Sequence, residues 1–356
     1  MKFDLLSLGD HLPDPHSGEY HDSQSDRHLL WTDLGITAER LGFDGFWLGE
    51  HHASDYILSS PQMVLAAVAA RTERVRLGTG VSLLPNNDPV RLAEDFATLD
   101  LLSRGRAEIG FGSGITAHTF HLFGQDVETG GERAAENLEL IQRLWNERRV
   151  SWAGRFRSAI DGTELQPRTF SGRAIPINRG VATNEATARE AGLAGHRLMC
   201  MTIAGPMETA GRLAAIYREA YREAGHDPAG ESVAAIARLH VQPDGDTARR
   251  FWKPYMDSYL AFSRTLLSTR GATAGIREVQ RQAAAQPAPA ADDYSGFPAL
   301  CGSPRELVDW IRDGHRVMGG FDRFIGYFDL GGLPRNAVMD AVTLFAEEVM
   351  PALAAV

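Results

Sequence analysis

The chain has 356 residues, 44% of them hydrophobic, and a formal net charge of -10 at pH 7. A chain of this length can bury a large core, in one large α/β domain or in two smaller ones. The negative charge argues against nucleic acids and anionic membranes as partners, because both are bound by basic surfaces.

The sequence carries no clear targeting or disulfide signal. The residues from Met1 to Leu8 are too few and too polar for a signal peptide, and no run reaches the roughly 18 apolar residues of a membrane helix. The two cysteines, Cys200 and Cys301, lie far apart and imply no disulfide framework. We therefore expect a soluble, cytoplasmic protein.

Apolar runs alternate with amphipathic stretches along most of the chain, which is the pattern of repeated βα units. Strands are predicted at 3–8, 45–48, 75–82, 106–112, 175–179, 197–202, 233–241 and 321–328. Helices are predicted at 26–41, 60–70, 89–102, 132–145, 184–194, 206–224 and 336–353, with another that starts at Ser303. Asp26 is the expected N-cap of the first helix, and Gly42 is its expected stop.

Two segments interrupt this alternation. Residues 150–173 look like a short hairpin inserted before the next strand, and residues 247–298 begin helically and then form a lid-like excursion over the barrel mouth. Eight strand–helix units fit a single (β/α)8 TIM barrel over residues 1–356. The competing doubly wound sheet needs a G-x-G-x-x-G fingerprint after the first strand, and GDHLPDPHSG lacks that spacing.

Glu50, His51 and His52 directly follow the predicted second strand, whose last residue before them is Gly49. In parallel α/β folds, chemistry takes place at the carboxyl ends of strands, and histidine is the commonest proton donor or acceptor there. The alternative is that Glu50 and one histidine form a buried pair that only anchors a loop. Adjacent histidines are poorly spaced for chelation, so no metal site is expected.

Glycines at two strand ends suggest where a ligand approaches the backbone. Gly78 and Gly80 leave part of the third strand without side chains, which suits either a flat ring or a crowded barrel position. After the fourth strand, Gly112 and Ser113 could expose backbone N–H groups to an anion, although a flexible loop tip is the simpler interpretation.

A glycine turn also precedes the helix at 184–194. The start of a helix favours anions, so this turn is a competent phosphate cradle, although most such sequences are ordinary capped helices. The residues of the turn are Gly180, Val181, Ala182, Thr183 and Asn184.

Three stretches together resemble the bacterial-luciferase-like flavin-dependent monooxygenases. They are GFDGFWLGEHH (42–52), RTERVRLGTGVSLLPNNDPVRLAEDFATLDLLSRGRAEIGFGSG (71–114) and CGSPREL (301–307). The resemblance implies that His51 is the active-site histidine, supported by His52 and Glu50. It also implies a non-proline cis peptide at Gly80–Val81 behind the isoalloxazine ring, and a flavin phosphate loop from Gly180 to Thr187.

The resemblance further implies an activity. The expected enzyme takes reduced FMN from a separate flavin reductase and uses O2 to oxygenate a small organic substrate through a C4a-peroxyflavin. Gly112 and Ser113 stand where luciferase α-subunits have a reactive cysteine and a phosphate-binding arginine, which argues against light emission. The alternatives are a deazaflavin-dependent oxidoreductase that transfers hydride and a non-catalytic flavin-binding subunit. By analogy with the family, the helices at 60–70 and 89–102 predict a homodimer.

Overall fold

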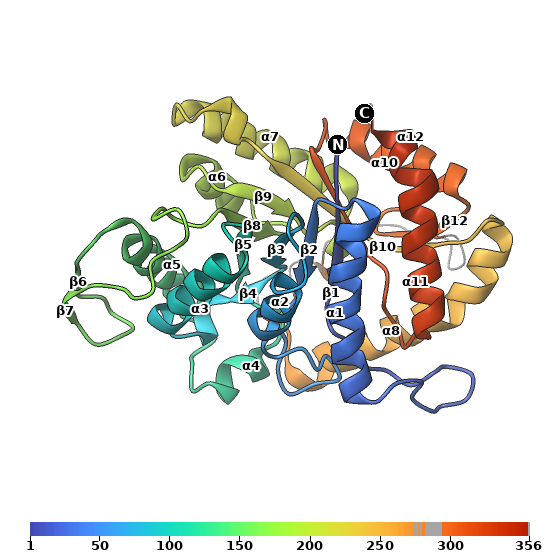
Figure 1. Ribbon diagram of the computed structural model, residues 1–356, viewed down its shortest axis with the longest axis horizontal. Coiled ribbons are helices and arrows are strands. Elements are labelled where there is room, and N and C mark those ends of the chain that lie inside the picture. The colour runs from blue at the N-terminus through green and yellow to red at the C-terminus, as the bar shows by residue number, and fades with distance from the viewer. Residues whose placement is uncertain (274–276, 278–279, 282–293, 355–356) are drawn as a thin grey trace.

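The computed structural model describes residues 1–273, 277, 280–281 and 294–354. Eight parallel strands close into a barrel with helices around it, which confirms the predicted (β/α)8 fold (Figure 1). In order around the barrel the strands are β1 (Lys2–Ser7), β2 (Gly45–Leu48), β3 (Arg76–Thr79), β5 (Ala107–Gly112), β8 (Ile177–Val181), β9 (Arg197–Cys200), β10 (Val233–Val241) and β13 (Arg323–Tyr327).

The helices that cover the barrel follow the predicted ranges closely. They are α1 (Gln24–Leu41), α2 (Pro61–Ala69), α3 (Pro89–Leu102), α5 (Gly130–Asn146), α6 (Glu185–Leu193), α7 (Met207–Glu223), α10 (Pro304–Val317), α11 (Arg335–Leu344) and α12 (Met350–Leu353), with a π-helical turn at Phe345–Val349 between the last two. The prediction of Asp26 as the first N-cap is wrong. Ser23 is the N-cap, and Asp26 completes a capping box three residues later.

The predicted third strand, 75–82, is not continuous. It consists of β3 and the short β4 (Ser82–Leu83), which are separated by a cis peptide between Gly80 and Val81. β4 pairs with β5 rather than continuing along β2. The chain therefore shifts at this point toward the neighbouring strand.

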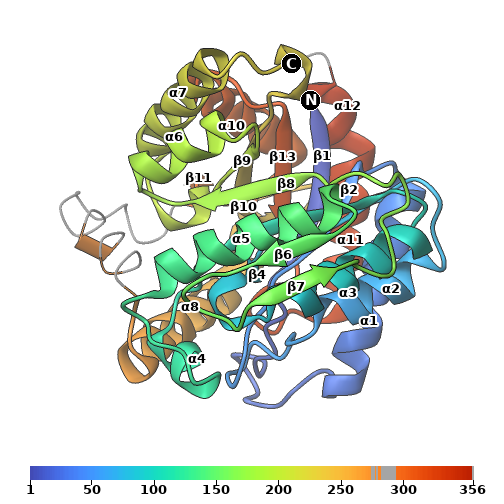
Figure 2. The same ribbon diagram turned by 90° about the vertical axis from the view of Figure 1, so that its left-hand side faces the viewer.

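The two expected interruptions are present in part. The hairpin of β6 (Val150–Trp152) and β7 (Ile160–Thr163) lies on the outside of the barrel beside α5 (Figure 2). The second segment begins as a 26-residue helix, α8 (Gly245–Arg270), and ends in β11 (Ser295–Gly296) and β12 (Ala299–Gly302). Part of the expected lid, at 274–276, 278–279 and 282–293, lies outside the described residues.

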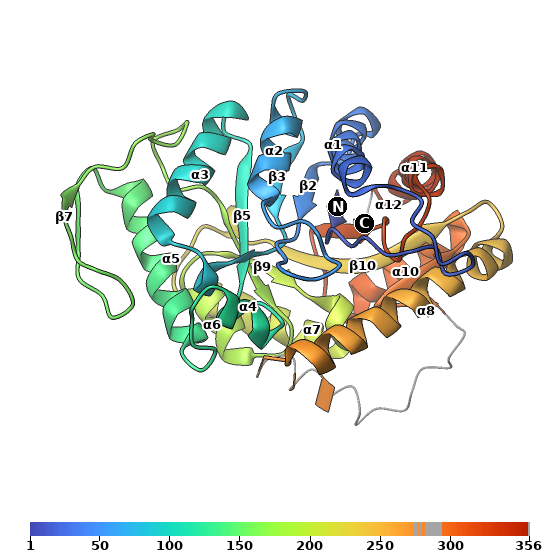
Figure 3. The same cartoon turned by 90° about the horizontal axis from the view of Figure 1, so that it is seen from below.

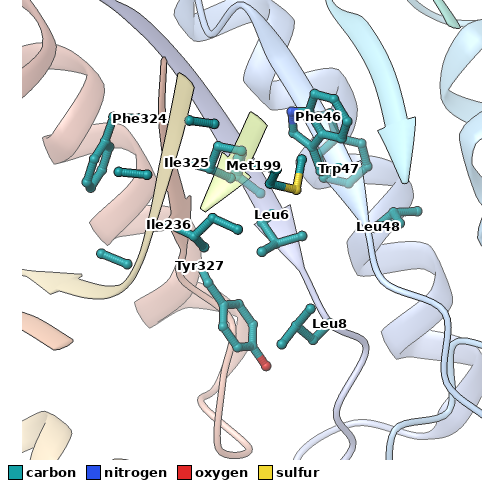
Figure 4. Close-up of a cluster of buried hydrophobic side chains, with 14 of the residues drawn as sticks. Leu6, Leu8, Phe46, Trp47, Leu48, Met199, Ile236, Phe324, Ile325 and Tyr327 are labelled. Carbon is teal, nitrogen blue, oxygen red and sulfur yellow. The ribbon is translucent and has the colours of Figure 1, made fainter. Parts of the chain in front are cut away.

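The face at which the barrel strands end, called the mouth here, is where α8 and α4 (Ala117–Leu122) lie (Figure 3). Tyr255 and Tyr259 on the inner side of α8 are buried. Inside the barrel, Leu6, Trp47, Met199 and Ile325 pack together, with Leu8 and Tyr327 at one end of this cluster (Figure 4). None of the described helices is long and apolar enough to cross a membrane.

Candidate active site

The amino-terminal end of the barrel interior is closed by a layer of paired charges, called the charged floor here. Buried Asp4 accepts hydrogen bonds from Trp47 Nε1 and Arg323 Nη1, both at 2.6 Å. Buried Glu108 contacts Arg76, Arg197 (2.8 Å) and Asn178 (3.0 Å). Burial alone would raise the pKa of Glu108, but the three arginines around it lower that pKa to about 2.

The mouth is built differently on one side. Side chains alternate between the two faces of a strand, so residues two or four positions after an inward-facing floor residue also face inward. On the adjacent strands β2, β3, β5 and β8 these inward positions at the mouth are all glycine. We call this side the glycine half, and its residues are Gly49, Gly80, Gly112 and Gly180.

Val81 covers part of the glycine half. A Cβ atom added to Gly112 would lie 2.9 Å from Val81 Cγ2, and one added to Gly180 would lie 3.1 Å from Val81 Cγ1. A Cβ on Gly80 would meet Leu6 Cδ1 at 3.1 Å. The structure thus brings four of the predicted cofactor-binding residues into one surface of backbone and one valine, which suits a flat ring.

Gly78 has a different explanation from Gly80. A Cβ atom there would lie 2.3 Å from the ring of Trp47, so the position is filled by protein. The strand glycines were expected to mark either a site for a flat ring or a crowded barrel position, and Gly78 is a crowded position.

The expected cis peptide at Gly80–Val81 is confirmed. Gly80 N donates to Leu48 O at 2.9 Å, and Val81 O accepts from Glu50 N at 3.2 Å. These bonds connect the cis peptide to the end of β2, where the three predicted catalytic residues begin.

Glu50 is buried and its carboxylate is fully engaged. One oxygen accepts from Leu83 N at 3.0 Å, and the other accepts from Asn87 Nδ2 and contacts His52 Nε2, both at 2.9 Å. His52 also packs its ring edge-on against Phe123. Glu50 and His52 therefore hold the segment that follows the cis peptide, and their support of His51 stays a prediction.

His51 is half-buried and stacks on Tyr56, with ring centroids 4.2 Å apart. Its backbone N donates to Leu58 O at 3.0 Å, while no described residue hydrogen-bonds its ring. Burial, with a smaller effect of His52, lowers the pKa of His51 to about 3. The imidazole is therefore neutral at pH 7, with one nitrogen able to donate and one able to accept.

The turn from Gly180 to Asn184 leads from β8 into α6. Asn184 is the N-cap, and its side chain accepts from Thr187 N at 3.1 Å. Ala182 and Thr183 are half-buried, and the first turn of α6 retains N–H groups that need acceptors. This geometry can hold a phosphate. Ser113, after β5, is exposed.

The inward positions on the other four strands carry side chains, and we call this side the side-chain half. Its residues are Met201 after β9, Arg238 on β10, Tyr327 on β13 and Leu8 after β1. Tyr327 donates to buried Asp10, and Tyr56 donates to Tyr259 on α8 at 2.8 Å.

The local sequence pattern did not identify the residues of the side-chain half as part of a site. For Arg238 a signal existed, since it lies in the predicted strand 233–241 two residues after inward-facing Ile236 (Figure 4). For Tyr56 and Tyr259 there was none, because their hydroxyls meet only in the folded chain. Among the described residues, no cluster of three or more histidine, cysteine or acidic side chains could hold a metal ion.

Known proteins similar to this chain share its fold and part of its sequence. The 4-hydroxyprotoasukamycin monooxygenase of Streptomyces nodosus subsp. asukaensis is 30% identical over 90% of this chain and 86% of its own. The crystal structure of monooxygenase RslO1 from Streptomyces bottropensis has 27% identity and a TM-score of 0.82, covering 99% of this chain and 100% of that chain.

The oxygenating constituent of 3,6-diketocamphane monooxygenase from Pseudomonas putida, solved in complex with FMN, has a TM-score of 0.78 at 18% identity. It covers 99% of this chain and 98% of its own, and it supports the fold alone. The family described as luciferase-like monooxygenase matches residues 1–322. The chain is therefore an oxidoreductase that belongs to the luciferase-like monooxygenase family.

Proposed function

We propose that this enzyme uses reduced FMN, delivered by a separate flavin reductase, and O2 to oxygenate a small organic substrate at the mouth of the barrel. The observation that carries the proposal is the glycine half, where Gly80, Gly112 and Gly180 carry no side chains and Val81 covers part of the surface between them. A planar ring system needs such a surface, and the FMN complex of the diketocamphane enzyme supports the choice of flavin.

The residues of the mouth fit a flavin in two places. The ring would lie against Gly80, Val81, Gly112 and Gly180, and the phosphate would meet the turn from Gly180 to Asn184 at the start of α6. A bound reduced flavin would supply the two electrons that activate O2, and O2 would supply the oxygen atom that enters the substrate. The protein supplies position and surroundings.

His51 is the proposed proton donor and acceptor. Its ring is neutral and has no hydrogen-bond partner among the described residues, so both nitrogens are available to a ligand. A bound anion nearby would raise its pKa toward neutrality, because opposite charge favours the protonated ring. Above it, buried Tyr259 on α8 meets Tyr56, which helps to exclude water from the mouth.

His51→Ala tests this role. The variant should lose turnover by roughly 100-fold or more, which is typical for removal of a general acid or base. It should keep the unfolding midpoint and the affinity for reduced FMN of the parent. The matched control is His121→Ala, an exposed histidine on α4, which should change neither property. Unchanged turnover of His51→Ala would remove His51 from the mechanism.

The cofactor is tested by anaerobic titration with reduced FMN and with a reduced deazaflavin, followed by addition of 18O2. We expect preferential binding of FMN and one 18O atom in the product. Tight binding of the deazaflavin with no oxygen uptake would favour the hydride-transfer alternative. Binding of FMN with no turnover on any substrate would favour the non-catalytic subunit.

We also propose that the enzyme is a homodimer through α2 and α3. A groove of about 510 Å³ runs along these helices, from Glu50 and His52 to Met63 and Leu102. Met63 is 70% exposed and Leu102 is 53% exposed, which is unusual for such large apolar side chains on one face. Met63→Glu should convert a dimer to a monomer in sedimentation, and a monomeric parent would contradict the proposal.

A further inference from the structure

Among the inward-facing residues that make up the glycine half and the side-chain half, only Arg238 is charged. It faces inward from β10, level with Tyr327 on β13, and is half-buried. Its guanidinium lies 5.4 Å from the centre of the Tyr259 ring, and its Nη1 donates to Ile203 O at 3.1 Å. These contacts hold the guanidinium over the mouth, across from the glycine half.

The charge of Arg238 is not offset by a carboxylate. No described aspartate or glutamate lies within 4.0 Å of it, and its Nε is buried without a hydrogen-bond partner. Asp10, which is buried and contacts Tyr327, already accepts from Tyr327 and from Gly331 N at 2.7 Å. A buried N–H of an arginine without an acceptor is unfavourable unless a ligand supplies one.

Tyr259 adds a second donor beside Arg238. Its oxygen accepts from Tyr56 at 2.8 Å, and its own hydroxyl hydrogen has no acceptor among the described residues. A guanidinium whose Nε lacks an acceptor, next to a hydroxyl whose hydrogen lacks one, is suited to an oxygen that carries negative charge.

We propose that Arg238 and Tyr259 bind an anionic oxygen of the substrate, so that the molecule oxygenated is a carboxylate or a phenolate. This inference rests on the proposed function, in which the flavin occupies the glycine half and the substrate lies between the flavin and the side-chain half. Arg238 selects the substrate by charge, and the glycine half holds the cofactor.

The test compares matched anionic and neutral probes by calorimetry, with the apoprotein and with the reduced FMN complex under anaerobic conditions. The pairs are benzoate and benzamide, phenylacetate and phenylacetamide, and 4-nitrophenolate and 4-nitroanisole. We expect the anion of at least one pair to bind tenfold or more tightly than its neutral partner. The first two pairs report a carboxylate, and the third reports a phenolate.

Arg238→Met should reduce the affinity for that anion at least tenfold and leave the neutral partner unchanged, and Arg238→Lys should recover part of the loss. The matched control is Arg179→Met. Arg179 is also half-buried, stacks on Phe111 at 4.4 Å and has no described carboxylate partner, but it points outward toward the helices. Its substitution should leave the discrimination intact.

The inference is overturned if the parent distinguishes none of the pairs, or if Arg238→Met loses the anion and the neutral probe equally. It is also overturned if Arg238→Met weakens reduced FMN itself, since Arg238 would then contact the cofactor. Failure of the parent to bind reduced FMN would refute the proposed function instead. The preference of the apoprotein for an anionic probe over its neutral partner could still be measured in that case.

Discussion

The two ends of the barrel interior each contain an inward-facing arginine, and the two arginines differ in whether a carboxylate lies beside them. At the charged floor, Arg323 is buried, donates to Asp4 at 2.6 Å and lies 3.9 Å from Glu108. At the mouth, Arg238 is half-buried and has no carboxylate partner within the described residues. A charge removed from water is stable only where partners offset its desolvation. The charge of Arg323 is therefore offset inside the floor, whereas no described carboxylate offsets the charge of Arg238. The Nε atoms of both arginines are buried without a hydrogen-bond partner, so the two residues differ in their carboxylates and not in that atom.

The same contrast holds for size. The floor positions carry long side chains that meet across the barrel, whereas four neighbouring positions at the mouth carry none. Large buried networks stabilise a fold, and missing side chains create room for a ligand. On the proposed function, stability and function are thus assigned to opposite ends of the same eight strands.

The largest expected effect is at the floor. Arg323→Met removes the cation that Asp4 contacts and leaves that carboxylate buried, because Asp4 has no other ion pair among the described residues. We expect the free energy of unfolding to fall by about 3–5 kcal/mol, as is usual when one partner of a buried pair is removed. Urea unfolding at pH 7 measures it, and a loss below about 1 kcal/mol would show that the floor does not stabilise the fold.

Acid should weaken the protein before the floor begins to titrate. Burial lowers the pKa of His51 to about 3 and those of His196 and His240 to about 4, from 6.5. Below pH 6.5 the unfolded chain therefore binds more protons than the folded one, and each group lowers stability by roughly 1.4 kcal/mol per pH unit. Asp10, whose pKa burial raises to about 6, acts in the opposite direction.

Glu108 affects the stability only at lower pH. Its pKa is about 2 in the folded protein instead of 4.5, so its contribution to the free energy of unfolding is lost between pH 4.5 and 2. Urea unfolding between pH 7 and 4 should thus show a steady decline. His240→Phe should reduce the slope of this decline by the contribution of one histidine. Phenylalanine is a suitable replacement because His240 already packs beside Phe251. A profile of the parent that stays level from pH 6.5 to 4.5 would contradict the neutral, buried histidines.

The smallest effect is expected at the mouth. Arg238→Met leaves no carboxylate without a partner and removes the contacts of the guanidinium with Tyr259 and its hydrogen bond to Ile203 O. The free energy of unfolding should fall by at most about 1 kcal/mol. A decrease in the free energy of unfolding as large as that of Arg323→Met would mean that both arginines stabilise the fold to the same extent.

Local sequence signals predicted most of the fold. The eight barrel strands were found because each is a short apolar run between breakers, and α3 matches its predicted range of 89–102. The prediction that the segment at 247–298 begins helically is confirmed, but the length of α8, which continues past Pro254 to Arg270, was not predicted. Its buried face of Trp252, Tyr255 and Tyr259 packs on the barrel, and such packing is not visible in a local pattern.

β12 was missed because ALCG is a run of only four residues placed directly before the helix at Ser303. It becomes a strand by pairing with the far end of β10. Predictions for the site divide in the same way. Glu50, His51 and the glycines are adjacent to strand ends and could be read from the sequence. The meeting of Arg238 with Tyr259 depends on where α8 docks, and only the fold reveals it.

The central claim is that the glycine half holds the flavin ring and the side-chain half does not. Its most direct test is an anaerobic titration with reduced FMN of the parent, Gly180→Val and Arg238→Met, with the unfolding midpoint of each protein measured alongside. Overpacking by the valine should cost about 1–3 kcal/mol of binding, so Gly180→Val should bind roughly 10- to 100-fold more weakly, while Arg238→Met matches the parent. A folded Gly180→Val that binds reduced FMN as tightly as the parent would contradict the account.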